Sequence, residues 1–287
     1  MPSTRQVTSR IKTAKNISKI TKAMEMVSAS KMKRAQVQAL QSRPYALAII
    51  DTLQTLTRES NITLHPLFTQ HKEGEELLVC LSTDRGLSGS FNPNLFRELV
   101  TWRKKHPQGK VVAVGKKAIA FAKFAGVVVH AQFTSMPDPL SLKDTLPITT
   151  LILEGYRQKE FRIVTLLFMD FVNTLSQKPM LQQLLPLNSE LVETTITSTV
   201  KTEYLFEPSA REILDKLVPY YVENSVFQAF LESKASEHSA RMVAMKNASE
   251  NAQELQEELQ LIYNKSRQAS ITSELLDITT ATLTLNT

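Results

Sequence analysis

The sequence contains one cysteine, seven glycines and no long apolar run, and each shortage excludes a class of protein. Cys80 has no partner for an internal disulfide, and a lone thiol is typical of a reducing compartment. No apolar run approaches the ~18 residues of a membrane-spanning helix. The opening residues MPSTRQVTSRIK lack the apolar core of a secretion signal. Few glycines among 287 residues favour long helices.

Motifs of catalysis and ligand binding are scarce. The five histidines show no ligand spacing, and no second cysteine exists to complete a zinc site. Gly115-Lys116-Lys117 resembles part of a phosphate-binding loop, but Lys110 stands where that pattern requires glycine, and no Ser or Thr follows Lys116. The segment 86–89 (GLSG) lacks the dinucleotide fingerprint, and a tight strand-to-helix turn is its simpler interpretation. We expect no cofactor, no metal site and no catalysis by this chain alone.

The last eighty residues predict one long helix with a narrow apolar seam. The seam residues follow one another at intervals of three and four, as in supercoiled helices, and charged residues fill the other faces. So thin a stripe needs a second helix of similar length to cover it. The predicted seam consists of Met242, Met245, Ala248, Ala252, Leu255, Leu259, Ile262, Ser266 and Ala269.

Residues 3 to about 58 predict that second helix, with Ser3 or Thr4 as its cap. Its charge complements the C-terminal helix, because residues 3–43 hold ten Lys or Arg against the single acid Glu25, whereas residues 209–287 are acidic on balance. Its predicted seam consists of Val7, Ile11, Ala14, Ile17, Ile20, Met24 and Val27. A stripe of lysines runs beside it, at Lys12, Lys15, Lys19 and Lys22.

The middle of the chain alternates apolar runs of strand length with helical patterns, which predicts an α/β layer with a mainly parallel sheet. We expect a Rossmann-like α/β domain inserted between the two helices of a long antiparallel coiled coil. The predicted domains are residues 1–60, 61–207 and 208–287. Predicted strands cover 76–83, 110–114, 127–130, 162–171 and 181–187, and predicted helices cover 92–105, 116–124 and 140–159, while Pro219 should kink or interrupt the last helix.

The lysine stripe leaves several interpretations open. It can be a solvated flank, or a surface that an acidic partner or the acidic second helix neutralises. A further alternative is that the lysines bind nucleic acid, although no aromatic residue lies between them in the sequence. The alternatives to a structural shaft are therefore a coiled-coil nucleic-acid binder and a nucleotide-binding α/β enzyme.

Blocks of sequence along the whole chain resemble one family. They are 17–32 (ISKITKAMEMVSASKM), 82–89 (STDRGLSG), 114–117 (VGKK), 174–179 (TLSQKP), 183–186 (QLLP), 240–248 (ARMVAMKNA) and 263–275 (YNKSRQASITSEL). Together they resemble the γ subunit of F-type ATP synthases, in the order of that family and without the insertion of its chloroplast members.

The resemblance implies a non-catalytic rotor shaft. Its two helices enter the hexamer of α and β subunits, and its globular domain stands with ε on the c-ring, peripheral to the cytoplasmic side of a bacterial inner membrane. It implies that Met24 and the lysine stripe meet acidic loops of β, and that Arg85 also faces a β subunit. It implies that Arg267, Gln268, Thr272 and Glu274, near the C-terminus, contact β and the opposing helix. It also implies that the part of the globular domain that contacts the c-ring includes Tyr204, Phe206 and Glu207.

Overall fold

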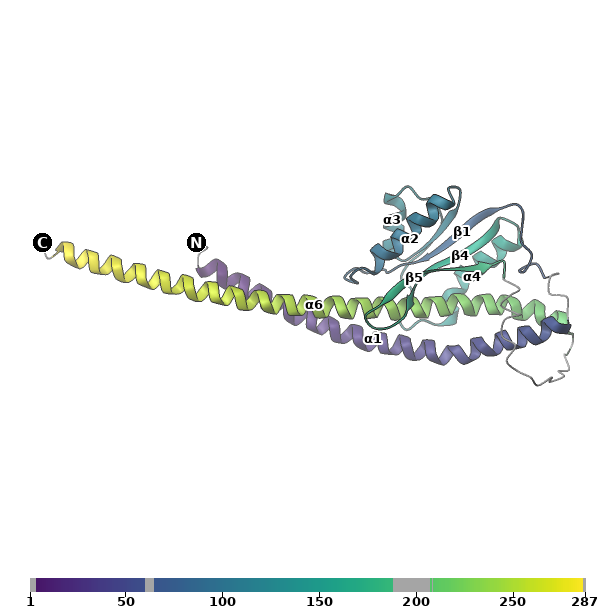
Figure 1. Cartoon of the computed structure of the whole chain (residues 1–287), viewed down its shortest axis with the longest axis horizontal. Coiled ribbons are helices and arrows are strands. Elements are labelled where there is room, and N and C mark those ends of the chain that lie inside the picture. Colours follow the sequence, from purple (N-terminus) through teal and green to yellow (C-terminus); the bar gives the residue numbers. More distant parts are fainter. Residues whose placement is uncertain (1–3, 60–64, 188–206, 208, 286–287) are drawn as a thin grey trace. The chain divides into compact units, whose positions relative to one another are not determined.

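Two long helices occupy the ends of the chain, and an α/β sheet lies between them in sequence. The computed structural model describes residues 4–59, 65–187, 207 and 209–285. Helix α1 covers Thr4–Glu59 and helix α6 covers Ala210–Leu285 (Figure 1). The chain separates into two compact units: residues 1–28 with 242–287, and residues 29–241. The predicted fold class, an antiparallel coiled coil with an inserted Rossmann-like α/β domain, is confirmed.

The sheet belongs to the unit of residues 29–241 and has the order β3-β2-β1-β4-β5. Neighbouring strands are parallel except for β4 and β5, which form an antiparallel hairpin that places β5 at one edge. Parallel strands joined by helices are the Rossmann-like arrangement that the alternating pattern predicts. The strands are β1 (Glu75–Leu81), β2 (Lys110–Val114), β3 (Val129–Phe133), β4 (Phe161–Phe171) and β5 (Gln177–Leu185).

Helices cover both faces of this sheet, so its central strands are apolar on both sides. Helices α2 (Phe91–Lys105) and α3 (Lys116–Phe124) pack one face through buried residues that include Leu95 and Leu99. On the other face lie α4 (Leu142–Arg157) and the parts of α1 and α6 that belong to this unit, with Ile148 and Val222 in the core (Figure 1).

Most predicted boundaries lie within two residues of the observed ones, and β2 and α3 match exactly. The strand predicted at 127–130 overlaps β3 only at its first two residues, because β3 covers Val129–Phe133. Gly126 adopts a left-handed φ of 61°, and the amide of Val127 donates to the carbonyl of Ala122. Val127 therefore closes the end of α3, and the strand starts only after it.

The prolines within the long helices interrupt neither of them. Pro44 lies inside α1, and Pro219 lies inside α6, which continues as one helix of 76 residues. Of the two effects predicted for Pro219, a kink or an interruption, the interruption is therefore wrong, and the kink stays a prediction. A proline removes one backbone hydrogen bond, but Leu214, Val218 and Val222 around it are buried in the core, and their burial holds the helix in place.

One turn of α6 fixes loops at the carboxyl edge of the sheet. The guanidinium of Arg241 donates to the carbonyls of Arg85 and Gly86, at 3.5 and 3.4 Å. Ser239 donates its hydroxyl to the carbonyl of Thr174, in the hairpin between β4 and β5, at 2.7 Å. These loops therefore take their positions from α6.

A buried histidine lies in the same turn. His238 Nε2 is 3.2 Å from Asp138 Oδ2, and Lys31 Nζ donates to that same oxygen at 2.8 Å. The carboxylate of Asp138 thus lies between a lysine of α1 and a histidine of α6.

Candidate partner-binding surface of the helix pair

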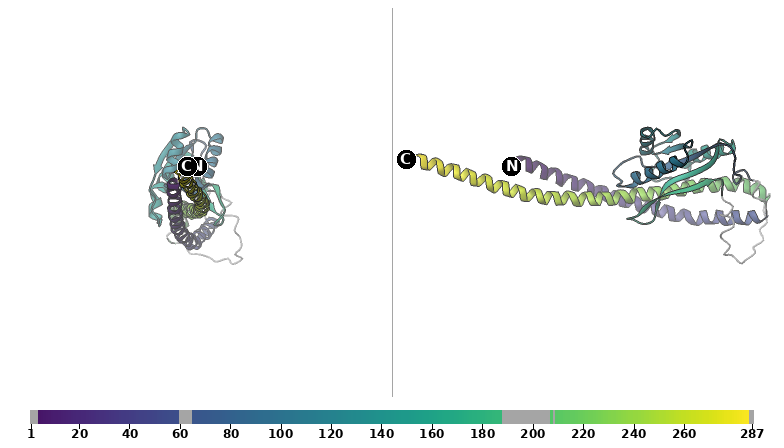
Figure 2. Two further views of the ribbon diagram at one scale, coloured as in Figure 1. Left: turned by 90° about the vertical axis from the view of Figure 1, so that its left-hand side faces the viewer. Right: turned by 45° about the horizontal axis from the view of Figure 1, so that its top comes forward.

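The unit of residues 1–28 and 242–287 is an antiparallel pair of helices, formed by the first part of α1 and the last part of α6 (Figure 2). Residues at heptad spacing on each helix meet at a common seam. On α1 the less exposed positions are Val7, Ile11, Ala14, Ser18, Thr21, Glu25 and Ser28. On α6 they are Met245, Ser249, Ala252, Gln256, Leu259 and Tyr263.

Small and polar side chains occupy the middle of this seam. Ser18 and Ser249 bring their hydroxyl oxygens within 3.3 Å, and Ser249 donates to the backbone carbonyl of Ser18 at 3.2 Å. Thr21 is buried and donates to the carbonyl of Ile17, one turn back in its own helix. A side chain that reaches the opposite backbone indicates close packing of the two helices.

The predicted seam is wrong at Ala269, which is exposed. It is also wrong at five positions where the helices instead expose large aliphatic side chains. Each of these residues comes directly before a residue of the observed seam. The sequence offers two stripes one residue apart. On α1 the less exposed stripe has the smaller side chains, Ser18, Thr21 and Ser28, which allow the helices to approach. On α6 it holds Gln256 and Tyr263, which are not smaller than the exposed Leu255 and Ile262. The exposed residues are Ile17, Ile20, Val27, Leu255 and Ile262.

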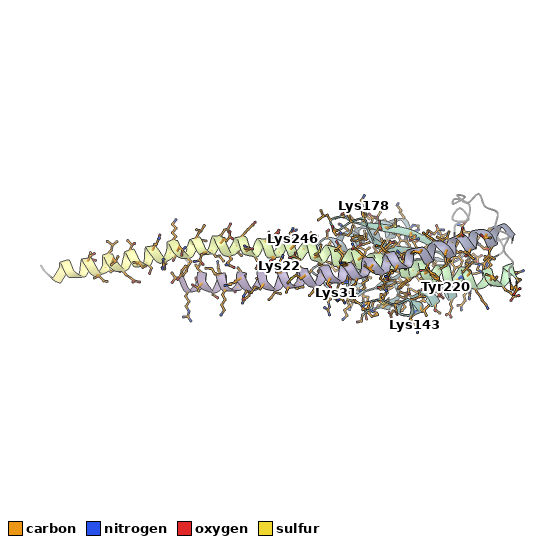
Figure 3. All side chains as sticks on the ribbon, turned by 90° about the horizontal axis from the view of Figure 1, so that it is seen from below. Lys22, Lys31, Lys143, Lys178, Tyr220 and Lys246 are labelled. Atoms are coloured by element: carbon orange, nitrogen blue, oxygen red, sulfur yellow. The ribbon has the colours of Figure 1, made fainter. Side chains whose placement is uncertain are left out.

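The predicted lysine stripe lies on the opposite flank, because each lysine directly follows a seam residue. Lys12, Lys15, Lys19 and Lys22 are all exposed. Lys22 pairs with Glu25 at 3.0 Å, and Lys19 and Lys22 share a groove of about 510 Å³ with Lys246 of α6. Figure 3 labels Lys22 and Lys246 on their two helices. Glu25 and Glu250 also line this groove, and Glu250 lies 3.9 Å from Lys246, so cations from both helices and two acids meet on one side of the pair.

Met24 is half-buried beside the seam. Near the end of the pair, Tyr263 lines a shallow groove with Thr4, Arg5 and Lys12 of α1. From residue 267 to residue 280, every side chain of α6 is exposed. The last part of α6 is thus a single helix without a covering partner in the described part of the chain.

The predicted C-terminal contact residues lie on this single helix. Arg267, Gln268, Thr272 and Glu274 are all exposed. Thr272 donates its hydroxyl to the carbonyl of Gln268 at 2.9 Å, and Glu274 accepts from the hydroxyl of Ser270 at 3.3 Å. The only hydrogen bonds described for these side chains are local to their own helix, so their outer surfaces can meet another molecule.

The remaining predicted contact residues belong to the other unit. The side chain of Arg85 is exposed, while its carbonyl accepts from Thr83 Oγ1 at 2.7 Å and from Arg241. Glu207 is also exposed, and Tyr204 and Phe206 lie outside the described residues. Sequence reasoning missed Arg241, because a single basic residue on a helix gives no distinct signal.

The N-terminal end of α3, where the phosphate-loop fragment lies, is occupied by the chain's own groups. Asp84 accepts from the amide of Lys116 at 3.1 Å, and Ser82 Oγ accepts from the amide of Ala118 at 2.8 Å. The amide between them, that of Lys117, donates to the carbonyl of Thr83 at 3.1 Å. A phosphate binds such a helix end through free amides, and the first three amides of α3 are already bonded.

Comparison with known proteins decides the family. The family model described as ATP synthase matches residues 3–285. The ATP synthase gamma chain of Glaesserella parasuis is 41% identical over 97% of this chain and 98% of its own length. That of Herpetosiphon aurantiacus is 41% identical over the full length of both. The chain belongs to the ATP synthase gamma-chain family.

Solved structures agree with this assignment to the gamma-chain family. A chain from the cryo-EM structure of the central stalk and c-ring of the Tetrahymena thermophila mitochondrial ATP synthase is 26% identical, with a TM-score of 0.61, over 80% of this chain and 99% of that one. A chain from the rotor of the Euglena gracilis enzyme is 21% identical, with a TM-score of 0.65, over 93% and 98%. The second likeness shows the shared fold.

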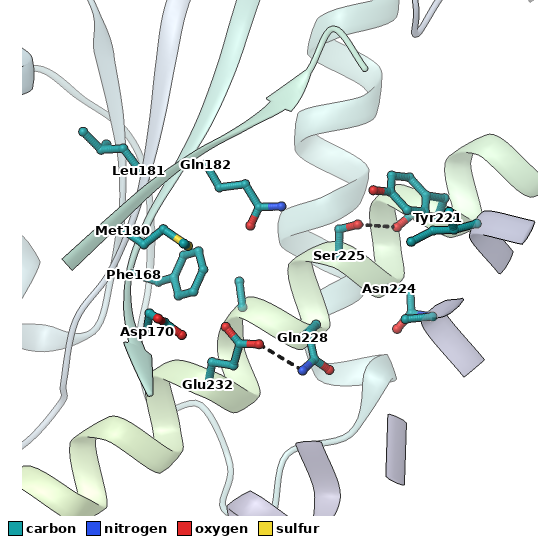
Figure 4. A pocket seen from close by; sticks show the side chains of 13 residues that line it. Phe168, Asp170, Met180, Leu181, Gln182, Tyr221, Asn224, Ser225, Gln228 and Glu232 are labelled. Atoms are coloured by element: carbon teal, nitrogen blue, oxygen red, sulfur yellow. Dashed lines mark hydrogen bonds between the residues drawn. The ribbon is translucent and has the colours of Figure 1, made fainter. Parts of the chain in front are cut away.

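A cavity within residues 29–241 of this gamma-family chain also disfavours a nucleotide. It measures about 550 Å³ and lies between the β4–β5 hairpin and the two long helices, within residues 29–241 (Figure 4). Asp170 and Glu232 contribute carboxylates, and Gln228 donates to Glu232 at 3.1 Å. Its lining holds no Lys or Arg, and a site of negative charge repels phosphate.

Proposed function

We propose that this chain is the rotating central shaft of a bacterial ATP synthase, which couples ion flow through the c-ring to catalysis on β subunits. The chain is itself a non-catalytic subunit of that complex. The observation that carries the proposal is the gamma-chain match over residues 3–285. The fold supports it, because two helices packed along a seam resist bending better than a single helix, and a shaft must transmit torque.

The charge on the helix pair supports a contact with β. A rotor must contact the β subunits with a different free energy at each angle. A partner that binds all conformations of a subunit equally shifts the population of none of them. Lys12, Lys15 and Lys19 are exposed on one side of α1, and Lys19 shares a groove with Lys22 and Lys246, whose charges Glu25 and Glu250 partly balance. An acidic loop on β would therefore meet these lysines at some angles and not at others.

The remaining partners follow the same model. The exposed side chains of Arg267, Gln268, Thr272 and Glu274 would contact β from the single-helix part of α6, and Arg85 would face a β subunit from the other unit. Tyr204, Phe206 and Glu207 would form the foot on the c-ring, with ε beside it. We place the chain at the cytoplasmic side of the inner membrane, as a peripheral protein, and retain the predicted domains 1–60, 61–207 and 208–287.

Within the ranges that the structure describes, no helix has the length and apolar character needed to cross a membrane. Contact with the membrane sector would then depend on the c-ring.

The test is reconstitution of the chain with α and β subunits of the same organism. We expect a stable complex that hydrolyses ATP and, with ε and the membrane sector, pumps ions. The rotor role would be contradicted by a chain that does not assemble with α and β. Salt-dependent DNA binding by such a chain would favour the coiled-coil nucleic-acid binder instead.

A further inference from the structure

The turn that follows helix α3 carries the most exposed large apolar side chain of the described residues. Phe124, the last residue of α3, is 89% exposed, and Val128, four residues later, is 55% exposed. A Cβ added at Gly126 would meet nothing within 4 Å, so the turn projects into open space. A single exposed apolar residue needs no explanation, but burial of a phenylalanine ring is favourable, and here the ring is left in water.

Exposed lysines occupy the last turns of α2 and α3. The two helices lie side by side on one face of the sheet (Figure 1), and the rings of Phe96 and Phe121 stack between them with centroids 4.4 Å apart. Each helix ends with lysines in its last turn, and the side chains of these lysines are exposed. Together with the apolar residues of the turn they form a cluster that we name the basic tip. It comprises Lys104, Lys105, Lys123, Phe124 and Val128.

Carboxylates at the edge where the strands begin are paired with other cations. Lys110 Nζ is 2.6 Å from Glu75 Oε2 and 3.5 Å from Glu160 Oε1. Arg162 donates to the carboxylate of Glu76. Among the described residues, no ion pair involves a lysine of the basic tip. The positive charge of the tip is therefore available to a partner of opposite charge.

The basic tip lies at the end of the domain where α6 begins. Helices that connect parallel strands run back to the edge where the strands start, so α2, α3 and α4 all end at that edge. Near the end of α4, Tyr156 donates its hydroxyl to the carbonyl of Thr69 at 2.7 Å. In the same segment, His65 Nε2 lies 3.6 Å from Oδ1 of Asp215, in the second turn of α6. The proposed c-ring contact at Glu207 comes just before α6, so it shares this end of the domain with the tip.

The chemistry of the basic tip fits an anionic lipid surface. Anionic headgroups attract lysines, and aromatic side chains are enriched at the headgroup level of membranes. A stable protein interface instead takes about 800 Å² from each partner around an apolar core, whereas the tip offers the apolar side chains of Phe124 and Val128 on a projecting turn. A small convex surface of this kind enters a fluid layer of headgroups more readily than it fits a fixed protein surface.

We propose that the basic tip contacts the anionic headgroups of the membrane beside the c-ring, with its lysines at the phosphates and Phe124 among the headgroups. This inference rests on the proposed rotor function, and it adds a direct contact with lipid to the contact through the c-ring. Lipids diffuse within the bilayer, so such a contact holds the domain near the membrane without favouring one angle of rotation.

The experiment measures how the complex of this chain with α and β subunits binds vesicles of phosphatidylethanolamine and phosphatidylglycerol. Phosphatidylcholine vesicles, which carry no net charge, are the reference. The complex is used because the lysine stripe of the helix pair would itself attract anionic lipid, and under the proposed function the ring of α and β subunits encloses that pair.

The variants remove equal charge from two parts of the same helices. The test variant is Lys104→Gln/Lys105→Gln/Lys123→Gln, and the matched control is Arg97→Gln/Lys116→Gln/Lys117→Gln. Every changed side chain is exposed, so folding should survive, and assembly with α and β checks it. A third variant, Phe124→Ser, removes the exposed ring and leaves the charge unchanged.

We expect the wild-type complex to bind the phosphatidylglycerol vesicles in preference to the reference vesicles. The test variant should bind them about 100-fold more weakly, because three cations beside an anionic surface are lost, and the control should bind as the wild type does. Phe124→Ser should bind about tenfold more weakly, and this loss should persist in moderate salt, which screens the lysines but not the ring.

A wild-type complex that does not bind the vesicles would overturn the inference, and so would equal losses in the test variant and the control. If Phe124→Ser binds as the wild type does, the proposed position of the ring among the headgroups is wrong. If the complex ignores lipid but needs the basic tip to bind ε, the tip contacts a protein and the inference fails. A chain that does not assemble with α and β contradicts the rotor function before any lipid is added, and the inference fails with it.

Discussion

Ser249 of α6 donates its side-chain hydroxyl to the backbone carbonyl of Ser18 on α1, at 3.2 Å. This bond crosses the seam of the helix pair and requires a small side chain on each helix. The seam that large aliphatic residues would have formed is displaced by one residue, and those aliphatic residues are exposed instead.

Replacement of Ser249 tests how closely the helices pack. Ser249→Ala removes one hydrogen bond and should cost about 1 kcal/mol of stability. Ser249→Leu adds volume where the helices approach and should cost about 1–3 kcal/mol. Urea unfolding of the full chain, followed by circular dichroism, measures both. A leucine variant as stable as the wild type would show that the seam has spare room.

Substitution of Met24 tests the coupling function. Met24→Lys adds a cation beside the existing lysine stripe, and it should strengthen contact with acidic groups in some angular states more than in others. We expect reconstituted complexes to assemble normally but to pump fewer ions per ATP hydrolysed. Unchanged pumping per ATP would contradict this prediction. Lys33→Gln, on an exposed position of α1 in the other unit, serves as a control.

Neutralisation of the lysine stripe should weaken ring binding in a salt-dependent manner. Lys19→Gln/Lys22→Gln removes two cations from the groove of about 510 Å³. Exposed ion pairs contribute roughly 0.2–1 kcal/mol each, so the affinity should fall a few-fold at low salt and little at high salt. Titrations at two ionic strengths measure the effect, and an equal loss at both would argue against an electrostatic contact.

Replacement of the glycines that flank α3 tests how much each end of the helix depends on a residue without a side chain. Gly115 has a φ of 90°, and an added Cβ would lie 2.5 Å from the carbonyl oxygen of Ser82. Gly115→Ala should therefore cost about 3 kcal/mol or more. Gly126 also has a positive φ, 61°, but an added Cβ meets nothing within 4 Å. Gly126→Ala should cost only about 1 kcal/mol. Thermal unfolding of the two variants compares them directly.

His238 should make the chain less stable in mild acid. Burial lowers the pKa of His238, although the carboxylates of Glu237 and Asp138 act to raise it, while Arg241 and Lys234 lower it further. As the pH falls through the ordinary histidine range near ~6.5, the unfolded chain takes up the proton first, so stability decreases.

The variant His238→Gln removes this contribution. As the pH falls from about 7 to about 5, it should lose less stability than the wild type. Asp138, whose carboxylate also accepts from Lys31, has a lowered pKa, so its own effect belongs to a more acidic range. His65 has a pKa lowered by burial as well, and part of the pH dependence should therefore remain. Urea unfolding at several pH values between about 5 and 7 measures the stability of both chains. The same pH dependence in both would contradict the contribution assigned to His238.

The strands and helices could be predicted from the sequence because the apolar pattern of each segment matches the surface that it buries. The run from 162 to 171 is apolar enough for a central strand, and β4 begins one residue earlier, at Phe161. The seam could not be predicted, since Ile17 and Ser18 both satisfy the heptad interval and only the separation of the helices chooses between them. A rule based on hydrophobicity selects Ile17, whereas close packing selects Ser18.

The predicted contact residues rest on resemblance rather than on chemistry. Arg267 and Glu274 are ordinary exposed residues on a helix, and nothing local separates them from Glu254 or Lys265. The lysine stripe was visible as a pattern, but its common face with Lys246 depends on the pairing of two helices 200 residues apart in sequence. The Arg241 contact with the loop of Arg85 likewise requires the folded chain.

The carboxylate of Asp84 has a wider consequence. Its two oxygens accept from the amides of Lys116 and Ser135, each at 3.1 Å, so a side chain fills the position that a nucleotide would take in a comparable fold. A phosphate group would have to displace this carboxylate before it could accept from the amides of Lys116 and Ser135, and the loop that carries Ser135 would lose its tie to the end of β1.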